Sequence, residues 1–220
     1  MKRPIAHALF GLMLASLAVS ASAQITHTVG AGPAAGATIV DFGGSNTSFN
    51  NSTAVETNLP ATNYSGATFT GGNLYDPEVG ISGVAARPAG AVGNFWAIGP
   101  SQKGTVTFAA PVSYYGFLWG SPDPGAWNQV TFFNGTTKLA AFGGSVTSLG
   151  NAWSNSIYFS VSTNGGPLIT SVAFTASSPA FETAKHSYIT AVSEPESYAM
   201  LLAGLGLIGG IVRRRMSRQS

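Results

Sequence analysis

The chain has 220 residues, no cysteine, 28 glycines and only 8% charged residues. Without cysteine, it forms neither disulfides nor thiolate metal sites and has no cysteine nucleophile. The formal charge of +2 comes from the two ends, because residues 24–197 carry four basic and eight acidic side chains, so no basic nucleic-acid-binding surface is expected.

The first 23 residues are typical of a secretory signal peptide. Lys2 and Arg3 precede an apolar stretch, residues 5–19, and Ala21 and Ala23 place small side chains at the two positions that signal peptidase reads. We therefore expect signal peptidase to cleave before Gln24 and the mature chain to be exported. The alternative is an uncleaved anchor helix, which the shortness of the apolar stretch disfavours.

Residues 24–36 are rich in glycine and alanine and are predicted to be a flexible segment, followed by one domain over residues 37–191. Within that domain, short runs of β-branched and aromatic residues are separated by glycine, proline, asparagine and serine. Apolar and polar residues alternate in residues 105–108 and 156–162, as expected of half-buried strands. In residues 168–176, Leu168, Val172 and Phe174 are expected to share one face.

Residues 112–119 are apolar on both faces and predict a central strand. Asn134-Gly135 between two apolar runs predicts a hairpin. No stretch before the C-terminal tail has a sustained helical period. The sequence thus predicts an all-β fold, an antiparallel two-sheet sandwich similar to a jelly roll.

Signals for catalysis are weak. The mature region has two histidines, His27 and His186, and neither a G-x-S-x-G nor an H-E-x-x-H motif. We expect His186, which follows Lys185, at the surface or at a sheet edge. Asp76 and Glu78 would serve as general acid and base only in the alternative of a secreted carbohydrate-active enzyme. No catalytic residue is predicted.

Loops of a sandwich supply the oxygen ligands that Ca²⁺ prefers. No D-x-D-x-D-G loop is present, and no other cofactor is expected. The candidate ligands are the acidic residues Asp41, Asp76, Glu78, Asp123 and Glu182. Aromatic rings are the other candidate site, because they stack on sugars. The candidates are Trp119 and Trp127, and Trp127 is the better one because it follows the turn residues 124–126.

Residues 198–212 carry no charge, and Arg213, Arg214 and Arg215 follow at once. We expect a short C-terminal transmembrane helix over 198–212, below the roughly 20 residues of an ordinary span. The arginines would place its end on the cytoplasmic side and leave the sandwich outside.

Residues 192–216 resemble the PEP-CTERM sorting signal, in which Pro-Glu-Pro precedes an apolar helix with glycines and a basic cluster. Glu194 and Pro195 match the motif, and Ser193 stands where the family has proline. The resemblance implies processing by exosortase, a membrane transpeptidase of Gram-negative bacteria that make exopolysaccharide. The alternative is an ordinary tail anchor.

The implied route is export, an inner-membrane intermediate, and then the cell surface or the extracellular matrix. The partners would be signal peptidase, exosortase and the membrane, with exopolysaccharide as a further candidate. We expect a non-enzymatic protein of adhesion or exopolysaccharide association. The alternatives are the carbohydrate-active enzyme and a purely structural surface protein.

A second resemblance covers residues 110–190. The stretch 115–121, ending in Trp-Gly-Ser, is followed by Asp123 and by Asn128 before the next strand, and Ala180-Phe181-Glu182 comes later. The same order occurs in a group of exosortase-dependent surface proteins. That group continues with an Asp-Asn pair, where this chain has residues 183–185, Thr-Ala-Lys.

Overall fold

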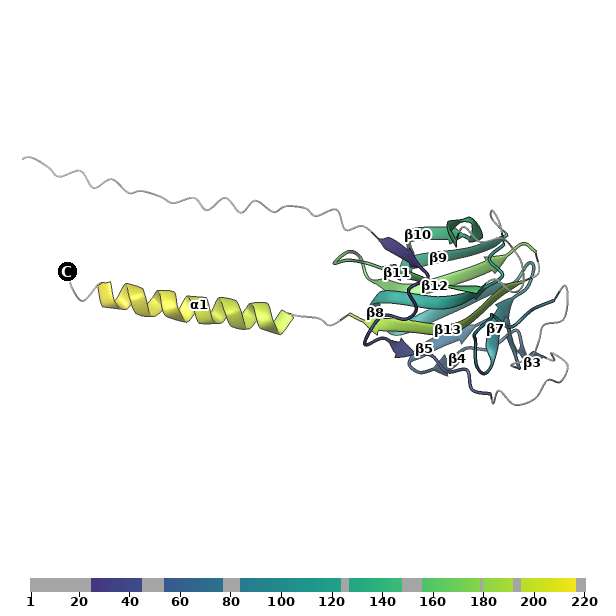
Figure 1. Ribbon diagram of the computed structural model, residues 1–220. Coiled ribbons are helices and arrows are strands. Elements are labelled where there is room, and N and C mark those ends of the chain that lie inside the picture. Colours follow the sequence, from purple (N-terminus) through teal and green to yellow (C-terminus); the bar gives the residue numbers. More distant parts are fainter. Residues whose placement is uncertain are drawn as a thin grey trace, which may run out of the picture.

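Figure 1 shows the computed structural model, which describes residues 25–44, 54–76, 84–123, 127–147, 156–178, 180–191 and 195–216. The predicted signal peptide 1–23 and its cleavage residues Ala21, Ala23 and Gln24 lie outside these ranges. The strands are β1 Thr26–Val29, β2 Thr38–Ile39, β3 Ala54–Thr57, β4 Thr62–Tyr64, β5 Ala67–Thr70, β6 Asn73–Tyr75, β7 Phe95–Ile98, β8 Lys103–Gly120, β9 Asn128–Asn134, β10 Thr137–Gly143, β11 Ser156–Ser162, β12 Ile169–Ala176 and β13 Phe181–Thr190. The helices are a 3₁₀ turn, Gly144–Thr147, and α1, Pro195–Met216.

The strands form two antiparallel layers that share β8. In the first layer the strand order is β4-β5-β8-β12-β9-β10, and in the second it is β1-β11-β8-β13-β7-β6-β3. β2 pairs with the C-terminal half of β13. β12 and β5 pair with the first half of β8, whereas β13 and β11 pair with its second half. The predicted all-β sandwich is confirmed.

β8 changes layers at Ala109–Pro111. The pairing with β12 jumps from Thr107–Ser171 to Val112–Ile169, and of the four residues between, Phe108 is buried and Ala109–Pro111 are exposed. Pro111 has no N–H to donate to a ladder, so the sheet opens there and the strand bends, as at the corners of packed sheets. The sequence indicated strands on both sides of this point, and the structure shows that they are one.

The space between the layers is filled by aromatic rings. Phe174 of the first layer lies 5.1 Å from Phe117 and 5.4 Å from Trp96 of the second, measured between ring centroids. The alternation predicted for residues 105–108 is confirmed, since Val106 and Phe108 are buried. In residues 156–162 it is not, because Tyr158 and Ser160 are buried as well as Phe159. Such rings bury large apolar areas and contribute most of the core.

Two local details differ from the sequence pattern. The pairing of β12 shifts between Ile169 and Ser171, so Ile169 is fully buried and Leu168 is only half-buried. The predicted hairpin joins β9 to β10, with Asn134 paired to Thr137 and Gly135 at φ 55°. A left-handed conformation there suits glycine.

Residues 24–36 contain a strand where a flexible segment was expected. Thr26–Val29 forms β1 and pairs with β11 from Ser162 to Phe159. The ring of His27 lies 4.9 Å from that of Phe142. Glycine and alanine content predicted flexibility, but the four β-formers between them suffice to extend the sheet.

The outer face of the second layer is covered by residues 84–94. Pro88 lies against Gly120, and the N–H of Ala89 donates to the hydroxyl of Ser156. A second apolar cluster forms beneath this segment and includes Phe95, Leu118 and Tyr158. The second layer is thus buried on both faces.

α1 extends away from the sandwich (Figure 1). Its described apolar side chains are exposed, among them Met200 at 75% and Leu207 at 69%. The helix begins at Pro195 and ends at Met216, and so exceeds the expected bounds 198–212 and includes the arginines 213–215. Proline suits a first helical turn, and cations suit the last turn. Among the described residues, no helix has both the length and the apolar character needed to cross a membrane.

Candidate functional site

One end of the sandwich gathers polar side chains from three distant segments. Asp123 follows the end of β8, Asn128 opens β9, and Glu182 lies at the start of β13. All three are nearly or fully buried, with Asp123 6%, Asn128 0% and Glu182 4% exposed. We call these three residues the carboxylate cluster. They belong to the motifs of the second resemblance, which the fold brings to one place.

Asn128 links the parts of the cluster. Its Nδ2 donates to Oδ2 of Asp123 at 2.8 Å and lies 3.5 Å from the carbonyl oxygen of Ala180. Gly144 lies so close to the backbone of Asp123 that a Cβ would overlap the Asp123 carbonyl oxygen. The start of the 3₁₀ turn therefore holds Asp123 in place.

Glu182 faces the segment that covers the second layer. Its Oε1 accepts a hydrogen bond of 3.0 Å from the N–H of Ala86. Burial raises the pKa of Glu182 to about 8, opposed by main-chain hydrogen bonds and supported by the nearby charge of Asp123. Burial also raises the pKa of Asp123, and its hydrogen bond to Asn128 acts in the opposite direction. Both carboxyls thus hold protons more tightly than in water.

The five predicted calcium ligands do not come together. Asp41 and Asp76 are exposed, and Asp41 accepts a hydrogen bond from the N–H of Gly43. Glu78 lies outside the described residues. In the described ranges, no group of three or more His, Cys, Asp or Glu side chains is placed to hold a metal ion. Of the four predicted ligands in the described ranges, Asp123 and Glu182 interact. Asn128 was not among the predicted ligands.

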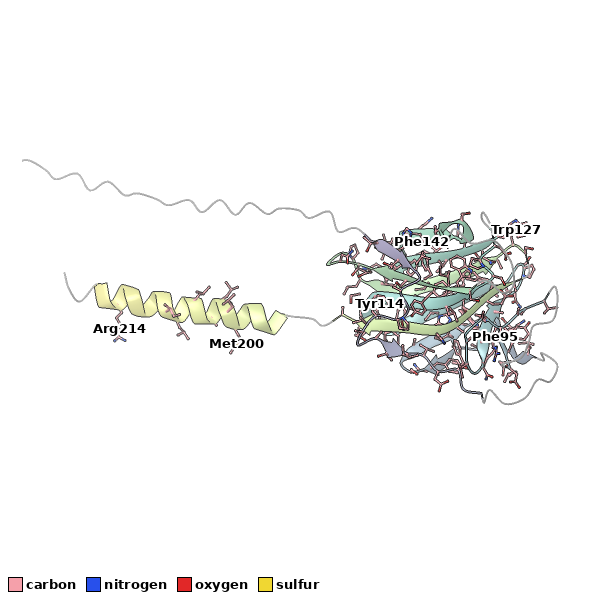
Figure 2. All side chains as sticks on the ribbon, viewed as in Figure 1. Phe95, Tyr114, Trp127, Phe142, Met200 and Arg214 are labelled. Carbon is pink, nitrogen blue, oxygen red and sulfur yellow. The ribbon has the colours of Figure 1, made fainter. Side chains whose placement is uncertain are left out.

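The two predicted sugar-stacking residues differ sharply. Trp119 is fully buried, and its ring stacks on that of Phe181 at 4.6 Å. The prediction for Trp119 is therefore wrong, because a sandwiched indole presents no face to a ligand. Trp127 is 46% exposed and lies at the end of the sandwich opposite α1 (Figure 2). It remains a candidate for stacking.

His186 is in the core, where a surface position was expected. β13 carries an extra residue between its pairs Ala184–Leu118 and Ser187–Gly116, and Lys185 there has φ 46°. Strict alternation would place His186 on the face of Glu182 and Ala184, and this bulge turns it inward instead. Lys185 points to solvent in its place.

The imidazole of His186 lies within a chain of hydrogen bonds. The hydroxyl of Thr183 donates to the carbonyl oxygen of Trp96 at 3.0 Å, so Thr183 accepts from Nε2–H of His186 at 2.9 Å. Nδ1 therefore accepts from the hydroxyl of Tyr115 at 2.5 Å. Burial lowers the pKa of His186 to about 3. A sealed, neutral imidazole has a structural role here.

A shallow depression of about 260 Å³ lies beside β6 and β7. It is lined in part by Asn73, Tyr75 and Gln102. Asn73 donates to the hydroxyl of Tyr75, and Gln102 accepts from the N–H of Gly99. These polar groups already bind one another, so the depression offers few free contacts to a ligand.

The sorting residues lie between the sandwich and α1. Ser193 and Glu194 are outside the described residues, whereas Pro195 is the first residue of α1. The helix was expected to begin at residue 198, after Pro195, but a proline in the first turn loses no helical hydrogen bond. The sandwich ends close by, since the N–H of Ala191 donates to the carbonyl oxygen of Pro111.

Comparison with known proteins identifies this last segment. Residues 191–215 match the family model of the PEP-CTERM protein-sorting motif. No curated protein matches the chain. The chain therefore carries a PEP-CTERM sorting motif at its C-terminus, and the motif points to an exported surface protein that exosortase processes.

Proposed function

We propose that this PEP-CTERM protein is held at the inner membrane through α1, is released by exosortase, and then acts at the cell surface without catalysis. There it would adhere to, or associate with, exopolysaccharide. The observation that carries the proposal is the sorting motif on a helix whose described apolar side chains are exposed. Exposed leucines such as Leu202 and Leu205 are compatible with a lipid environment.

The length of α1 is compatible with a temporary stay in the membrane. Its uncharged part, residues 198–212, measures about 22 Å as α-helix, which is shorter than the hydrocarbon thickness of about 30 Å. Arg213–Arg215 in the last turn would extend toward the cytoplasmic headgroups. A bilayer adapts to a short apolar stretch at modest cost.

The placement of Trp127 supports a carbohydrate contact. Its indole is the exposed aromatic at the end of the sandwich farthest from α1 in Figure 2. A ring at that end faces away from the membrane while the tail is inserted. The carbohydrate-active enzyme has less support, because His186 is sealed in the core and Asp76 is an exposed residue at the end of β6.

The route is tested by mass spectrometry of the mature C-terminus in a host with and without exosortase. We expect the surface form to lack the arginine-rich end and the exosortase-deficient host to retain it in the membrane fraction. The double substitution Glu194→Ala, Pro195→Ala should give the unprocessed form. Surface protein with an intact C-terminus at Ser220 would contradict the route.

The activity is tested by co-sedimentation with the host's exopolysaccharide. We expect Trp127→Ala to weaken binding by roughly 3- to 10-fold, the effect of one aromatic contact. Val92→Ala, which shortens another exposed apolar residue, is the matched control. If the wild-type chain does not sediment with the polysaccharide, the alternative of a purely structural surface protein replaces the proposed association with exopolysaccharide.

A further inference from the structure

We propose that Asp123, Asn128 and Glu182, together with the carbonyl oxygen of Ala180, bind one calcium ion at the end of the sandwich opposite α1. The site differs from the five-carboxylate set expected from the sequence. It keeps two of those residues and adds an amide and a main-chain oxygen.

The first argument is that Asn128 brings the oxygens of Asp123 and Ala180 together. Its Nδ2 lies against Oδ2 of Asp123 and the carbonyl oxygen of Ala180, so a half-turn of the amide, which exchanges Nδ2 and Oδ1, places three oxygens around one point. Ala180 precedes Glu182 by two residues, directly before β13, and the charge of Asp123 acts on Glu182. Four oxygen-bearing groups from three segments are thus held in one buried neighbourhood.

The second argument is that two buried oxygens of the cluster have no hydrogen-bond partner. They are Oδ1 of Asn128 and Oε2 of Glu182, each in a side chain that is at least 96% buried. A buried polar atom without a partner costs about 1–3 kcal/mol. Two of them beside a second carboxylate form an arrangement that a cation would satisfy.

The donor set selects the kind of cation. Carboxylate, amide and main-chain oxygens are hard ligands, which suit Ca²⁺ or Mg²⁺ rather than zinc or copper. Mixed neutral and charged oxygens, fixed by a sheet, favour calcium over magnesium, which requires near-ideal octahedral geometry. Water would complete the coordination shell.

A protonated Glu182 is the competing explanation for the same environment. A carboxylic acid there would carry Oε2–H, a buried donor that needs an acceptor, and would leave the site one negative charge short. Calcium instead requires both carboxylates to be ionised and takes oxygen ligands from each of them. The two explanations predict different responses to added calcium, because a protonated carboxyl alone has no use for the ion.

The test is calorimetric titration of CaCl₂ into the purified full-length chain in detergent, after removal of divalent ions with EGTA. We expect one ion per chain with a dissociation constant on the order of 10⁻⁴–10⁻³ M, the range of extracellular calcium modules. Glu182→Gln and Asp123→Asn, which keep the shape of the side chain, should each weaken binding about tenfold or more. Asp41→Asn and Asp76→Asn are matched controls and should bind as the wild type does.

A second measurement needs no variant. Hydrogen–deuterium exchange of the wild-type chain, with and without CaCl₂, should show calcium-dependent protection in residues 120–128 and 180–184. Absence of binding by the wild type, equal binding by the site variants, or protection confined to other segments would each overturn the proposal. MgCl₂ in place of CaCl₂ should protect these residues less.

Discussion

The imidazole of His186 is neutral because each of its nitrogens is already engaged with a neutral hydroxyl. Tyr115 donates to Nδ1, Nε2–H donates to Thr183, and aromatic rings surround the group, with Phe117 stacked at 5.7 Å. Burial lowers the pKa of His186, since the interior solvates an imidazolium poorly. The residue therefore resists protonation as long as the sandwich is folded.

This resistance predicts acid sensitivity. The folded pKa of His186 is about 3, whereas its ordinary value is 6.5. Between these values the unfolded state binds more protons, so the free energy of unfolding falls as pH drops from about 6.5 toward 3. The contribution of His186 to this loss between pH 7 and pH 4.5 should be roughly 2–3 kcal/mol. Glu182, whose pKa is raised to about 8, binds its proton more tightly in the folded state and acts in the opposite direction. Urea denaturation of the wild type and of a His186 variant across this pH range therefore isolates the share of the histidine.

The matched variants are His186→Gln and His27→Gln. The first should lower stability at pH 7 and remove this part of the acid dependence. The second changes an exposed histidine of β1 and should leave the pH dependence as in the wild type. An acid dependence that is the same in both variants would assign it to other groups.

Tyr115 offers a second residue-level prediction. Tyr115→Phe removes the donor to Nδ1 of His186 and leaves that nitrogen unpartnered in the core. The free energy of unfolding should fall by about 1–3 kcal/mol. Tyr64→Phe, in a half-buried ring at the sheet edge, should change it by less than about 0.5 kcal/mol. Chemical denaturation at pH 7 compares them.

The sequence pattern mispredicts the position of individual side chains for a definite reason. Hydrophobic alternation places a side chain by parity, and one inserted residue at Lys185 reverses the parity for His186. Trp119 was predicted to stack on a sugar, and its position between Phe117 and Phe181 places it in the core instead. Neither the bulge nor the ring partners are visible in the local pattern.

The long strand β8 organises the fold at the level of elements. It belongs to both layers and pairs with β5 and β12 at one end and with β11 and β13 at the other. The first half was predictable as a strand from its alternation, and the second half from its run of residues that are apolar on both faces. Their continuity was not, because Pro111 and two alanines read as a break, whereas the structure uses them as a corner.

A glycine of β8 sets how closely the layers approach. A Cβ at Gly104 would overlap the indole of Trp96 and come within 2.8 Å of Ile98. Gly104→Ala should therefore lower the free energy of unfolding by about 1–3 kcal/mol, the usual cost of overpacking. Ala110→Ser, at the exposed corner of the same strand, should cost less than about 0.5 kcal/mol. Thermal unfolding of the two variants separates packing from a general effect on the strand.

The whole molecule consists of a sandwich and a helix that does not pack on it. Deleting residues 192–220 should therefore leave the near-ultraviolet circular dichroism and the free energy of unfolding unchanged within about 0.5 kcal/mol. The rings of the core and the bond from Ala191 to Pro111 remain in such a chain. A clear loss of stability would show that the tail packs on the sandwich.

The candidate site shows what the sequence predicts at the largest scale and where it stops. The loop carboxylates and the motifs around Asp123 and Glu182 were recognisable in the sequence. That these two meet while Asp41 and Asp76 do not depends on strand pairing across more than fifty residues, which no local pattern specifies. The sorting motif was found directly because its residues are contiguous.

The short link between β13 and α1 limits the distance between the sandwich and the helix. Four residues separate Thr190 from Pro195, and a chain of that length reaches about 18 Å at full extension. In the proposed membrane-held stage, the folded sandwich would lie within that distance of the helix, and exosortase would have to reach the motif between the two. Inserting extra residues before the motif would lengthen this separation, so the distance to the folded sandwich would set how readily exosortase cleaves.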